Sequence, residues 1–161
     1  MNTPLISFLL QPETALVLDI DGVLAPYEFG ELCHSACPDE EWERFVREQD
    51  PYGHMRPVGL IQRMIAQKGA ERVYACSVAA DYAAAGKRDF VLRHYGLPAS
   101  HVRIVATKAD KLAFLEEVRA ALGLPEERVA LIEDTVGTLN LVYERTGFTT
   151  VHVSSLFAFD E

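Results

Sequence analysis

The chain has 161 residues, of which 49% are hydrophobic and 24% are charged. This length allows one domain with a real hydrophobic core, and the composition argues against a disordered, collagen-like or coiled-coil chain. Its 15 basic and 24 acidic residues give a net charge of −9, which disfavours nucleic acid and anionic membranes as partners. The apolar run Leu5–Leu10 is too short for a membrane helix or a secretory signal, and three cysteines imply no disulfide framework. We therefore expect one cytoplasmic domain over residues 1–161, with its oligomeric state left open.

Short apolar runs rich in Val, Leu and Ile alternate along the chain with helical patterns. The runs predict five strands, at residues 15–20, 72–76, 102–105, 129–132 and 150–153. Between them, helices are expected at residues 58–67, 81–95, 109–122 and 138–146, each followed by a glycine. This alternation predicts an α/β fold, a three-layer sandwich with a mainly parallel, Rossmann-like five-stranded sheet.

The stretch at residues 25–55 interrupts this rhythm with several prolines and glycines around one expected helix at residues 39–49. We interpret it as a short cap-like insertion after the first strand. Ligands of open α/β sheets bind just outside the carboxyl ends of the strands, so the insertion is placed to cover or line the site.

Two acids, Asp19 and Asp21, flank Ile20 at the end of the first predicted strand and precede Gly22. At strand spacing their side chains leave the same face, so we expect the carboxylates to converge. At about 4 Å and an effective dielectric of about 20, two such charges repel by roughly 4 kcal/mol. Such a pair needs a proton or a bound cation. On its own, however, a pair of aspartates followed by a glycine is also typical of an ordinary turn.

A second acidic pair, Glu133 and Asp134, ends the fourth predicted strand. If the first and fourth strands are neighbours, these acids form an oxygen-rich pocket suited to Mg²⁺. Ser77 ends the second strand, and Lys108 opens the helix after the third. Each of these residues alone has a structural reading, such as a helix cap or a solvated charge, but four signals at four strand ends favour a site.

Taken together, these motifs resemble those of the haloacid dehalogenase-like hydrolase superfamily. LVLDIDGVL at residues 16–24 resembles its first motif, YACS at 74–77 its second, and LIEDTVG at 131–137 its fourth. Lys108 fits the third, and the similarity extends from residue 15 to residue 153. The second acid, Asp21, matches the phosphatase pattern and argues against dehalogenase chemistry.

The resemblance implies a Mg²⁺-dependent phosphomonoester hydrolase. Asp19 would attack phosphorus and form an aspartyl-phosphate, and Asp21 would protonate the leaving oxygen and then deprotonate the water. Ser77 would hydrogen-bond a phosphate oxygen and Lys108 would neutralise phosphoryl charge. The implied metal site comprises residues Asp19, Asp21, Glu133 and Asp134, with Asp21 contributing its backbone carbonyl.

Several alternatives stay open at this stage. Lys111 lies one helical turn after Lys108 and is the other candidate for the motif lysine. Cys33, His34 and Cys37 could hold zinc, but the sequence offers no second paired cluster that would complete such a site. The chain could also be a non-catalytic domain that binds a phosphorylated ligand or a partner, or a phosphotransferase or phosphomutase. The short insertion implies an open site, and the substrate could be a phosphorylated small molecule or macromolecule.

Overall fold

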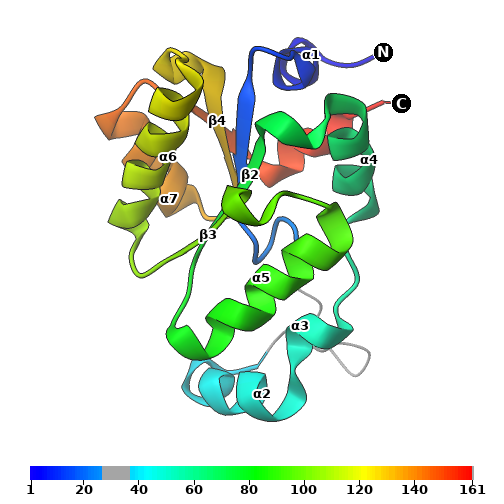
Figure 1. The fold of residues 1–161 in the computed structure, drawn as a ribbon, viewed down its shortest axis with the longest axis vertical. Coiled ribbons are helices and arrows are strands. Elements are labelled where there is room, and N and C mark those ends of the chain that lie inside the picture. Colours follow the sequence, from blue (N-terminus) through cyan, green and yellow to red (C-terminus); the bar gives the residue numbers. More distant parts are fainter. Residues whose placement is uncertain (27–36, 161) are drawn as a thin grey trace.

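A five-stranded parallel sheet forms the centre of the computed structural model, which describes residues 1–26 and 37–160 (Figure 1). The strands lie in the order β3-β2-β1-β4-β5, and every neighbouring pair is parallel. Their bounds are β1 Ala15–Leu18, β2 Val73–Val78, β3 Val102–Val105, β4 Val129–Glu133 and β5 Thr149–His152. The α/β class, the parallel sheet and the adjacency of the first and fourth strands are therefore confirmed.

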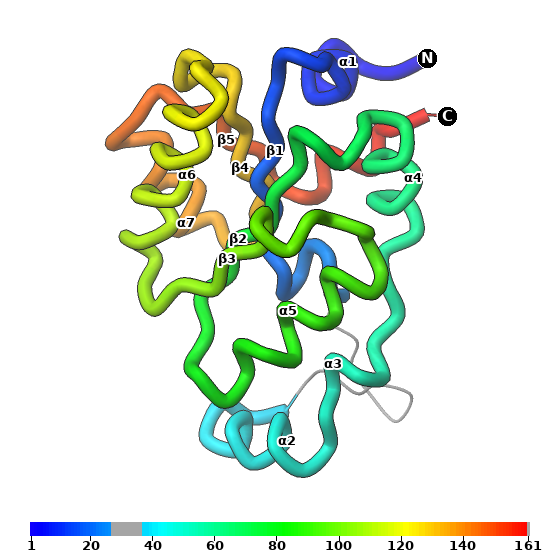
Figure 2. The backbone as a smooth tube through the Cα atoms, viewed as in Figure 1, coloured from blue at the N-terminus to red at the C-terminus, as the bar shows by residue number. Residues whose placement is uncertain are grey.

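Helices cover both faces of the sheet, giving three layers (Figure 2). One layer contains α6 and α7, and the other contains α1, α4 and α5. The bounds of these helices are α1 Pro4–Leu10, α4 Gly59–Lys68, α5 Asp81–Tyr95, α6 Lys108–Leu122 and α7 Val136–Arg145. Short 3-10 segments are η2 Ala70–Arg72, η3 Ala99–His101, η4 Glu126–Arg128 and η5 Val153–Ala158.

Successive residues of each central strand pack into opposite layers, as the pleat requires. In β1, Ala15 and Val17 belong to the apolar core beneath α6 and α7, whereas Leu16 and Leu18 belong to the core beneath α1, α4 and α5. All four side chains are completely buried. A strand buried on both faces reads as a continuous apolar run, which is why β1 could be recognised from its sequence.

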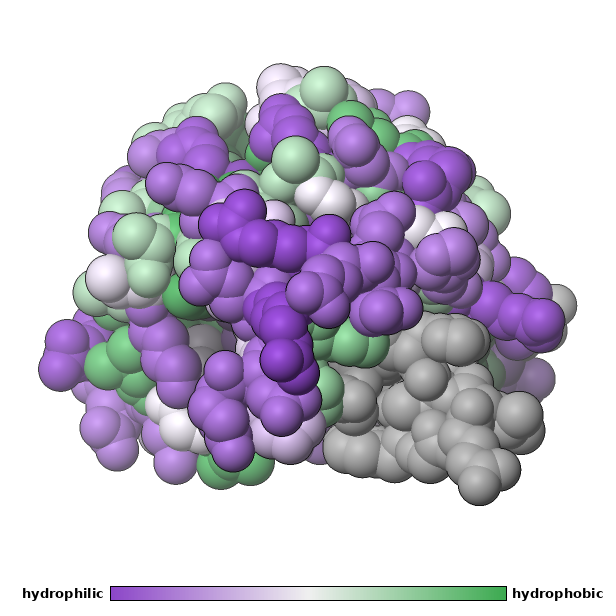
Figure 3. Space-filling view, turned by 90° about the horizontal axis from the view of Figure 1, so that it is seen from below, coloured by the Kyte–Doolittle hydropathy of each residue, from purple (hydrophilic) through white to green (hydrophobic). Residues whose placement is uncertain are grey.

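The insertion after β1 contains three short helical segments, η1 Asp39–Glu41, α2 Trp42–Gln49 and α3 Pro51–His54. Both α2 and α3 pack against α5. Figure 3 views the molecule from the end where these helices lie and shows a mostly hydrophilic surface over the described residues. The outer side of α2 carries charges of both signs, including the ion pair of Arg47 with Glu43 at 2.8 Å. Cys33 and His34, two of the three candidate zinc ligands, lie outside the described residues.

Helix α1 was not expected from the sequence, and helix α7 starts at a different residue from the one expected. The apolar run near the start forms α1, whose first turn is capped by the Thr3 hydroxyl accepting from the Ile6 amide at 3.3 Å. Helix α7 begins at Val136, two residues earlier than expected, because Glu133 accepts hydrogen bonds from the amides just before it. In the described part of the chain, no helix has the length and apolarity needed to cross a membrane.

Candidate active site

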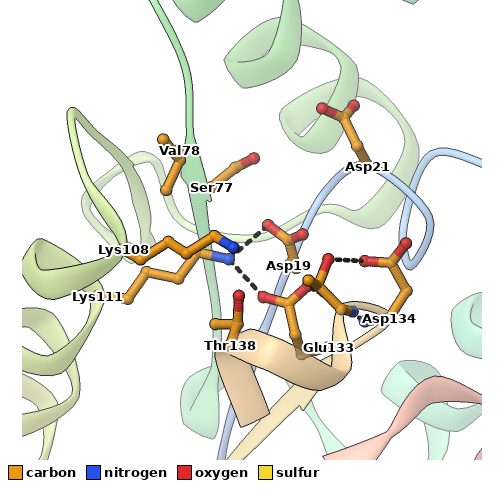
Figure 4. Close-up of a pocket in the computed structure, with 10 residues that line it drawn as sticks. Asp19, Asp21, Ser77, Val78, Lys108, Lys111, Glu133, Asp134 and Thr138 are labelled. Atoms are coloured by element: carbon orange, nitrogen blue, oxygen red, sulfur yellow. Dashed lines mark hydrogen bonds and ion pairs between the residues drawn. The ribbon is translucent and has the colours of Figure 1, made fainter. Parts of the chain in front are cut away.

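A pocket of about 170 Å³ lies at the carboxyl ends of β1, β2 and β4 (Figure 4). All six residues predicted for the site line this pocket, although they come from four separate segments of the chain. Its lining comprises residues Asp19, Asp21, Ser77, Val78, Lys108, Lys111, Glu133, Asp134, Thr135 and Thr138. The parallel sheet explains this convergence, because the carboxyl ends of all its strands meet at one edge.

Asp19 directly follows β1 and extends its ladder, since its amide donates to the Ile132 carbonyl of β4 at 2.9 Å. Its side chain is directed toward the layer of α6, continuing the alternation of Ala15 and Val17. There the ammonium of Lys111 lies 2.9 Å from Asp19 Oδ1. Asp19 is 8% exposed, so it is a buried carboxylate with one cation at its side.

Lys111, rather than Lys108, forms ion pairs with the acids. Its ammonium lies 2.6 Å from Glu133 Oε2 in addition to its contact with Asp19. Lys108 is exposed at the pocket, and among the described residues it forms no hydrogen bond or ion pair. The start of helix α6 explains this difference between the two lysines. Thr107 and Asp110 form a reciprocal capping box, which places the first residue of the helix at Lys108. Lys108 is therefore the first helical residue, while Lys111 falls on the buried stripe of α6.

Burial and charge act against each other in this pair. Burial raises the pKa of Asp19 to about 6, with the Lys111 ammonium lowering it and the Glu133 carboxylate raising it. For Lys111, burial lowers the pKa, but the two carboxylates more than offset this and hold it above its usual value. At neutral pH Asp19 is therefore mostly ionised beside the Lys111 ammonium.

Glu133 is the most constrained of the acids. It is 1% exposed, and its Oε1 accepts from the amides of Asp134 and Thr135, both at 3.2 Å, while Oε2 accepts from Lys111. Asp134 is only half-buried, and its Oδ1 accepts from the Thr135 hydroxyl at 3.4 Å. Asp134 and Asp19 therefore keep more free oxygen lone pairs than Glu133 does.

The described residues include one cluster of acids that could hold a metal ion, Asp19, Glu133 and Asp134, with one ligand atom from each lying within 4.8 Å of the others. Among the described residues, one ammonium, that of Lys111, forms ion pairs with two of these three carboxylates. An oxygen-only donor set with excess negative charge fits a hard divalent cation such as Mg²⁺. The predicted set also contained Asp21, whose side chain is not part of this cluster.

The expected convergence of Asp19 and Asp21 is wrong. Strand β1 ends at Leu18, so the two-residue alternation does not carry the second acid to the same face. Asp21 instead bonds Lys87 of α5 through Oδ2 at 2.5 Å, and its Oδ1 accepts from the Tyr52 hydroxyl of α3 at 2.7 Å. Figure 4 shows its side chain apart from the other three acids.

Lys87 and Tyr52 both contact Asp21 at the pocket, although the sequence-based prediction of the site contained neither of them. Lys87 is 3% exposed and lies on the apolar stripe of α5 with Ala83, Phe90 and Val91, all of them buried. A lysine at a core position of a helix indicates a buried partner, and this signal was available in the sequence. No comparable signal marks Tyr52, because the short helix α3 has no periodicity to read.

Cys76, which precedes Ser77, is a buried core residue. It packs in the apolar cluster beneath α6 and α7 with 0% exposure, and burial raises the pKa of its thiol to about 12. A thiol of this kind stays protonated and unreactive at neutral pH. The sequence-based interpretation of Cys76 as a small hydrophobic residue is confirmed.

Comparison with models of protein families finds none that matches the chain. A search of curated proteins finds no match either.

Proposed function

We propose that the chain is a Mg²⁺-dependent phosphomonoester hydrolase that works through an aspartyl-phosphate on Asp19. The alternatives are a non-catalytic domain that binds a phosphorylated ligand or a partner, and a phosphotransferase or phosphomutase. Phosphoryl transfer requires a positioned nucleophile surrounded by neutralising charge more than it requires elaborate covalent chemistry. The site offers that combination.

The observation that carries this proposal is the environment of Asp19. Its carboxylate is buried at the end of the central strand, one of its oxygens pairs with Lys111, and it lines a pocket that also contains a hydroxyl, Ser77. Burial disfavours the charged form of this carboxylate. Buried ionisable groups with a specific charge partner in a pocket are frequent at functional sites. Attack on phosphorus is a task that uses an ionised, partly desolvated carboxylate.

A bound Mg²⁺ would be held mainly by Asp19 and Asp134, with Glu133 beside them. When bound, the ion would neutralise phosphoryl oxygens and the carboxylates that approach them. The donor set supports this assignment, since the three carboxylates lie together while the Lys111 ammonium pairs with two of them, and Glu133 is already engaged in three hydrogen bonds. Glu133 thus serves chiefly to hold Lys111 and the turn that carries Asp134.

The remaining steps use the side chains of the chain itself. The Lys111 ammonium orients the Asp19 carboxylate, and the Ser77 hydroxyl is available at the pocket to donate to a phosphoryl oxygen. Asp21 gives a proton to the leaving oxygen in the first step. In the second step it takes a proton from the water that attacks the aspartyl-phosphate, which restores it for the next turnover.

The pocket is small, about 170 Å³, so it suits a phosphoryl group and leaves the organic part of the ester outside. The insertion helices α2 and α3 pack on α5, and the Tyr52 side chain of α3 contacts Asp21 at the pocket. This geometry supports a substrate whose bulk lies beyond the pocket, whether a phosphorylated small molecule or a macromolecule.

The test is phosphate release from a panel of phosphomonoesters, including p-nitrophenyl phosphate and phosphopeptides, with Mg²⁺ and with EDTA. We expect turnover with Mg²⁺ that EDTA abolishes, and the best substrate of the panel identifies the class. Failure of folded protein to release phosphate from any ester, while it binds Mg²⁺ and inorganic phosphate, would favour the non-catalytic alternative. Transfer of the phosphoryl group to an added alcohol in preference to water would favour a phosphotransferase.

Gly22 provides a structural test of the acid cluster. Its φ is +78°, and a Cβ at this position would lie 2.2 Å from Asp134 Oδ2. We expect Gly22→Ala to weaken Mg²⁺ binding at least tenfold by displacing Asp134, and to cost about 1–2 kcal/mol of unfolding free energy for its left-handed backbone. Calorimetric titration with MgCl₂ and urea denaturation measure the two effects.

Gly96 provides the matched control for this substitution. Its φ of +62° is also left-handed, but a Cβ there would meet nothing within 4 Å. Gly96→Ala should therefore lose similar stability and bind Mg²⁺ like the wild type. Equal Mg²⁺ affinities in the two variants would contradict the placement of Asp134 in the metal site.

The raised pKa of Asp19 predicts a pH-dependent effect of Mg²⁺ on stability. In the metal-free protein, protonation of Asp19 contributes stability that is fully present below its unfolded pKa of 3.8 and is lost as the pH rises through about 6. Above that pH the Asp19 carboxylate is charged, and bound Mg²⁺ neutralises this charge. Mg²⁺ should therefore raise the melting temperature more above pH 7 than at pH 5. Differential scanning calorimetry measures this, and an Mg²⁺ effect that is equal at both pH values would contradict it.

A further inference from the structure

Lys87 is a buried cation whose three donors all reach oxygen atoms. Its ammonium lies 2.5 Å from Asp21 Oδ2, 3.0 Å from the Val78 carbonyl and 3.2 Å from Ser77 Oγ. Its side chain is 4% exposed and does not line the pocket. Lys87 therefore contacts three residues that do line the pocket, and it can act only through them.

Strand geometry explains why these groups meet. In β2, Tyr74 and Cys76 belong to the core beneath α6 and α7, while Val73 and Ala75 belong to the core on the other side. Ser77 continues the second set and so lies on the side of α5, which supplies Lys87. The edge of the sheet thus has one buried lysine from each helical layer, Lys111 beside Asp19 and Lys87 beside Ser77 and Asp21.

The insertion completes the contacts of Asp21. The Tyr52 hydroxyl donates to Asp21 Oδ1 at 2.7 Å, and the Tyr52 ring, 1% exposed, packs edge-on against Phe90 of α5 with centroids 6.5 Å apart. Each oxygen of Asp21 thus accepts one hydrogen bond from a buried donor. A carboxylate has about four acceptor positions, so lone pairs remain for a group in the pocket.

We propose that Lys87 is a positioning residue that, together with Tyr52, fixes the orientation of the Asp21 carboxyl group for taking the proton of the hydrolytic water. This inference rests on the proposed hydrolase function. In that step the water oxygen forms a bond to phosphorus, the bond from phosphorus to Asp19 breaks, and its electron pair returns to the Asp19 carboxylate. The water proton passes to Asp21, so the orientation of the Asp21 carboxyl group matters in this half of the reaction.

The Lys87 ammonium also determines the direction of the hydroxyl hydrogen of Ser77. Because Ser77 Oγ accepts from Lys87, its own hydrogen is free to be donated toward the pocket. One buried cation therefore aligns an acceptor for the water proton and a donor for a phosphoryl oxygen. These two groups come from different strands, and Lys87 links them.

The test compares Lys87→Met with wild type on p-nitrophenyl phosphate, whose leaving group departs without needing a proton. We expect kcat to fall about 10- to 100-fold, as for other residues that orient a reacting group, and kcat/KM to fall less than kcat because this leaving group needs no proton. Rapid mixing should then show a burst of about one p-nitrophenol per enzyme, because the aspartyl-phosphate still forms faster than it is hydrolysed. A merely structural defect lowers the active fraction and produces no such burst.

Tyr52→Phe keeps the ring against Phe90 and removes the hydrogen bond, so it serves if Lys87→Met folds poorly. It should lower kcat about fivefold and give the same burst, since it removes one hydrogen bond of ordinary strength. Lys68→Met, at the end of α4 where the ammonium bonds the Gln11 carbonyl, is the control and should keep the wild-type kinetics.

The outcomes separate the two levels of the proposal. If the wild type hydrolyses the ester with Asp19 phosphorylated, but Lys87→Met and Tyr52→Phe both lose kcat/KM without a burst or behave as wild type, the role of Lys87 is overturned and the hydrolase function stands. If the wild type neither turns over nor forms a phosphoenzyme, both are overturned.

Discussion

Replacement of Asp19 by Asn is expected to abolish phosphate release while leaving the fold intact. Asn keeps the shape of the side chain but cannot form the aspartyl-phosphate. Removal of a single stabilising donor from an active site already costs about 10²–10³ in kcat, so loss of the nucleophile should exceed about 10³-fold. Initial rates with saturating p-nitrophenyl phosphate and Mg²⁺ measure this, and circular dichroism checks the fold.

Asp39→Asn is the matched control for this variant. Asp39 begins the exposed segment η1 of the insertion and has no place in the pocket. It should keep the wild-type rate. A folded Asp19→Asn protein with more than about a tenth of wild-type activity is incompatible with Asp19 as the nucleophile, whatever the substrate.

The two lysines of α6 give the second large effect. Lys111→Met removes the ammonium that pairs with both Asp19 and Glu133, leaving these two buried carboxylates without that cation. Breaking a buried ion pair from one side costs about 3–5 kcal/mol, so the unfolding free energy should fall by that amount at neutral pH. Turnover should fall at least about 10²-fold, since charge at the nucleophile is no longer balanced.

Lys108→Met, one turn earlier on the same helix, should behave differently. Its side chain is exposed, so stability should change by less than about 0.5 kcal/mol. Because an exposed charge contributes at most about 1 kcal/mol, KM should rise no more than about fivefold. Urea denaturation and steady-state kinetics on both variants measure these effects. Larger losses in Lys108→Met than in Lys111→Met would restore Lys108 as the central lysine.

The two lysines of α6 differ in their position on the helix, and this difference is visible in the sequence. Lys108 opens the helix after the third strand and so fits the third motif, but helical periodicity favours Lys111 as the buried lysine. Lys111 lies in the middle of the stripe that Phe114, Leu115 and Val118 form, all buried in α6, whereas Lys108 lies at the edge of that stripe in the first turn. A charged residue on the buried stripe is the one that meets a buried partner.

Much of the fold was readable because its strands are buried on both faces and its helices are long. Continuous apolar runs such as β1 and β4 give an unambiguous signal, and their order along the chain determines a parallel sheet with crossovers. Helix α1 was missed because its apolar run was weighed only against a membrane segment. Its start signal, Thr3 followed by Pro4, was present in the sequence.

The site was predictable as a set of residues but not as a geometry. The sequence brought six pocket residues together because parallel strands end at one edge. The sequence could not predict the hydrogen-bond and ion-pair partners of Asp21. The direction of that side chain depends on where β1 ends and on contacts from α5 and α3. Tyr52 lies 31 residues away in a segment without periodicity, and only tertiary packing brings it to Asp21.

The most direct measurement is chemical identification of the phosphorylated residue. Wild-type protein is mixed with a phosphomonoester and Mg²⁺, quenched with acid during turnover, and treated with borohydride, which reduces an acyl phosphate to an alcohol. Peptide mass spectrometry should then find homoserine in place of Asp19, only in samples that received substrate, and never in Asp19→Asn. Steady turnover with an unchanged Asp19, or with the label on Asp21 or Asp134 instead, would contradict an aspartyl-phosphate mechanism at this site.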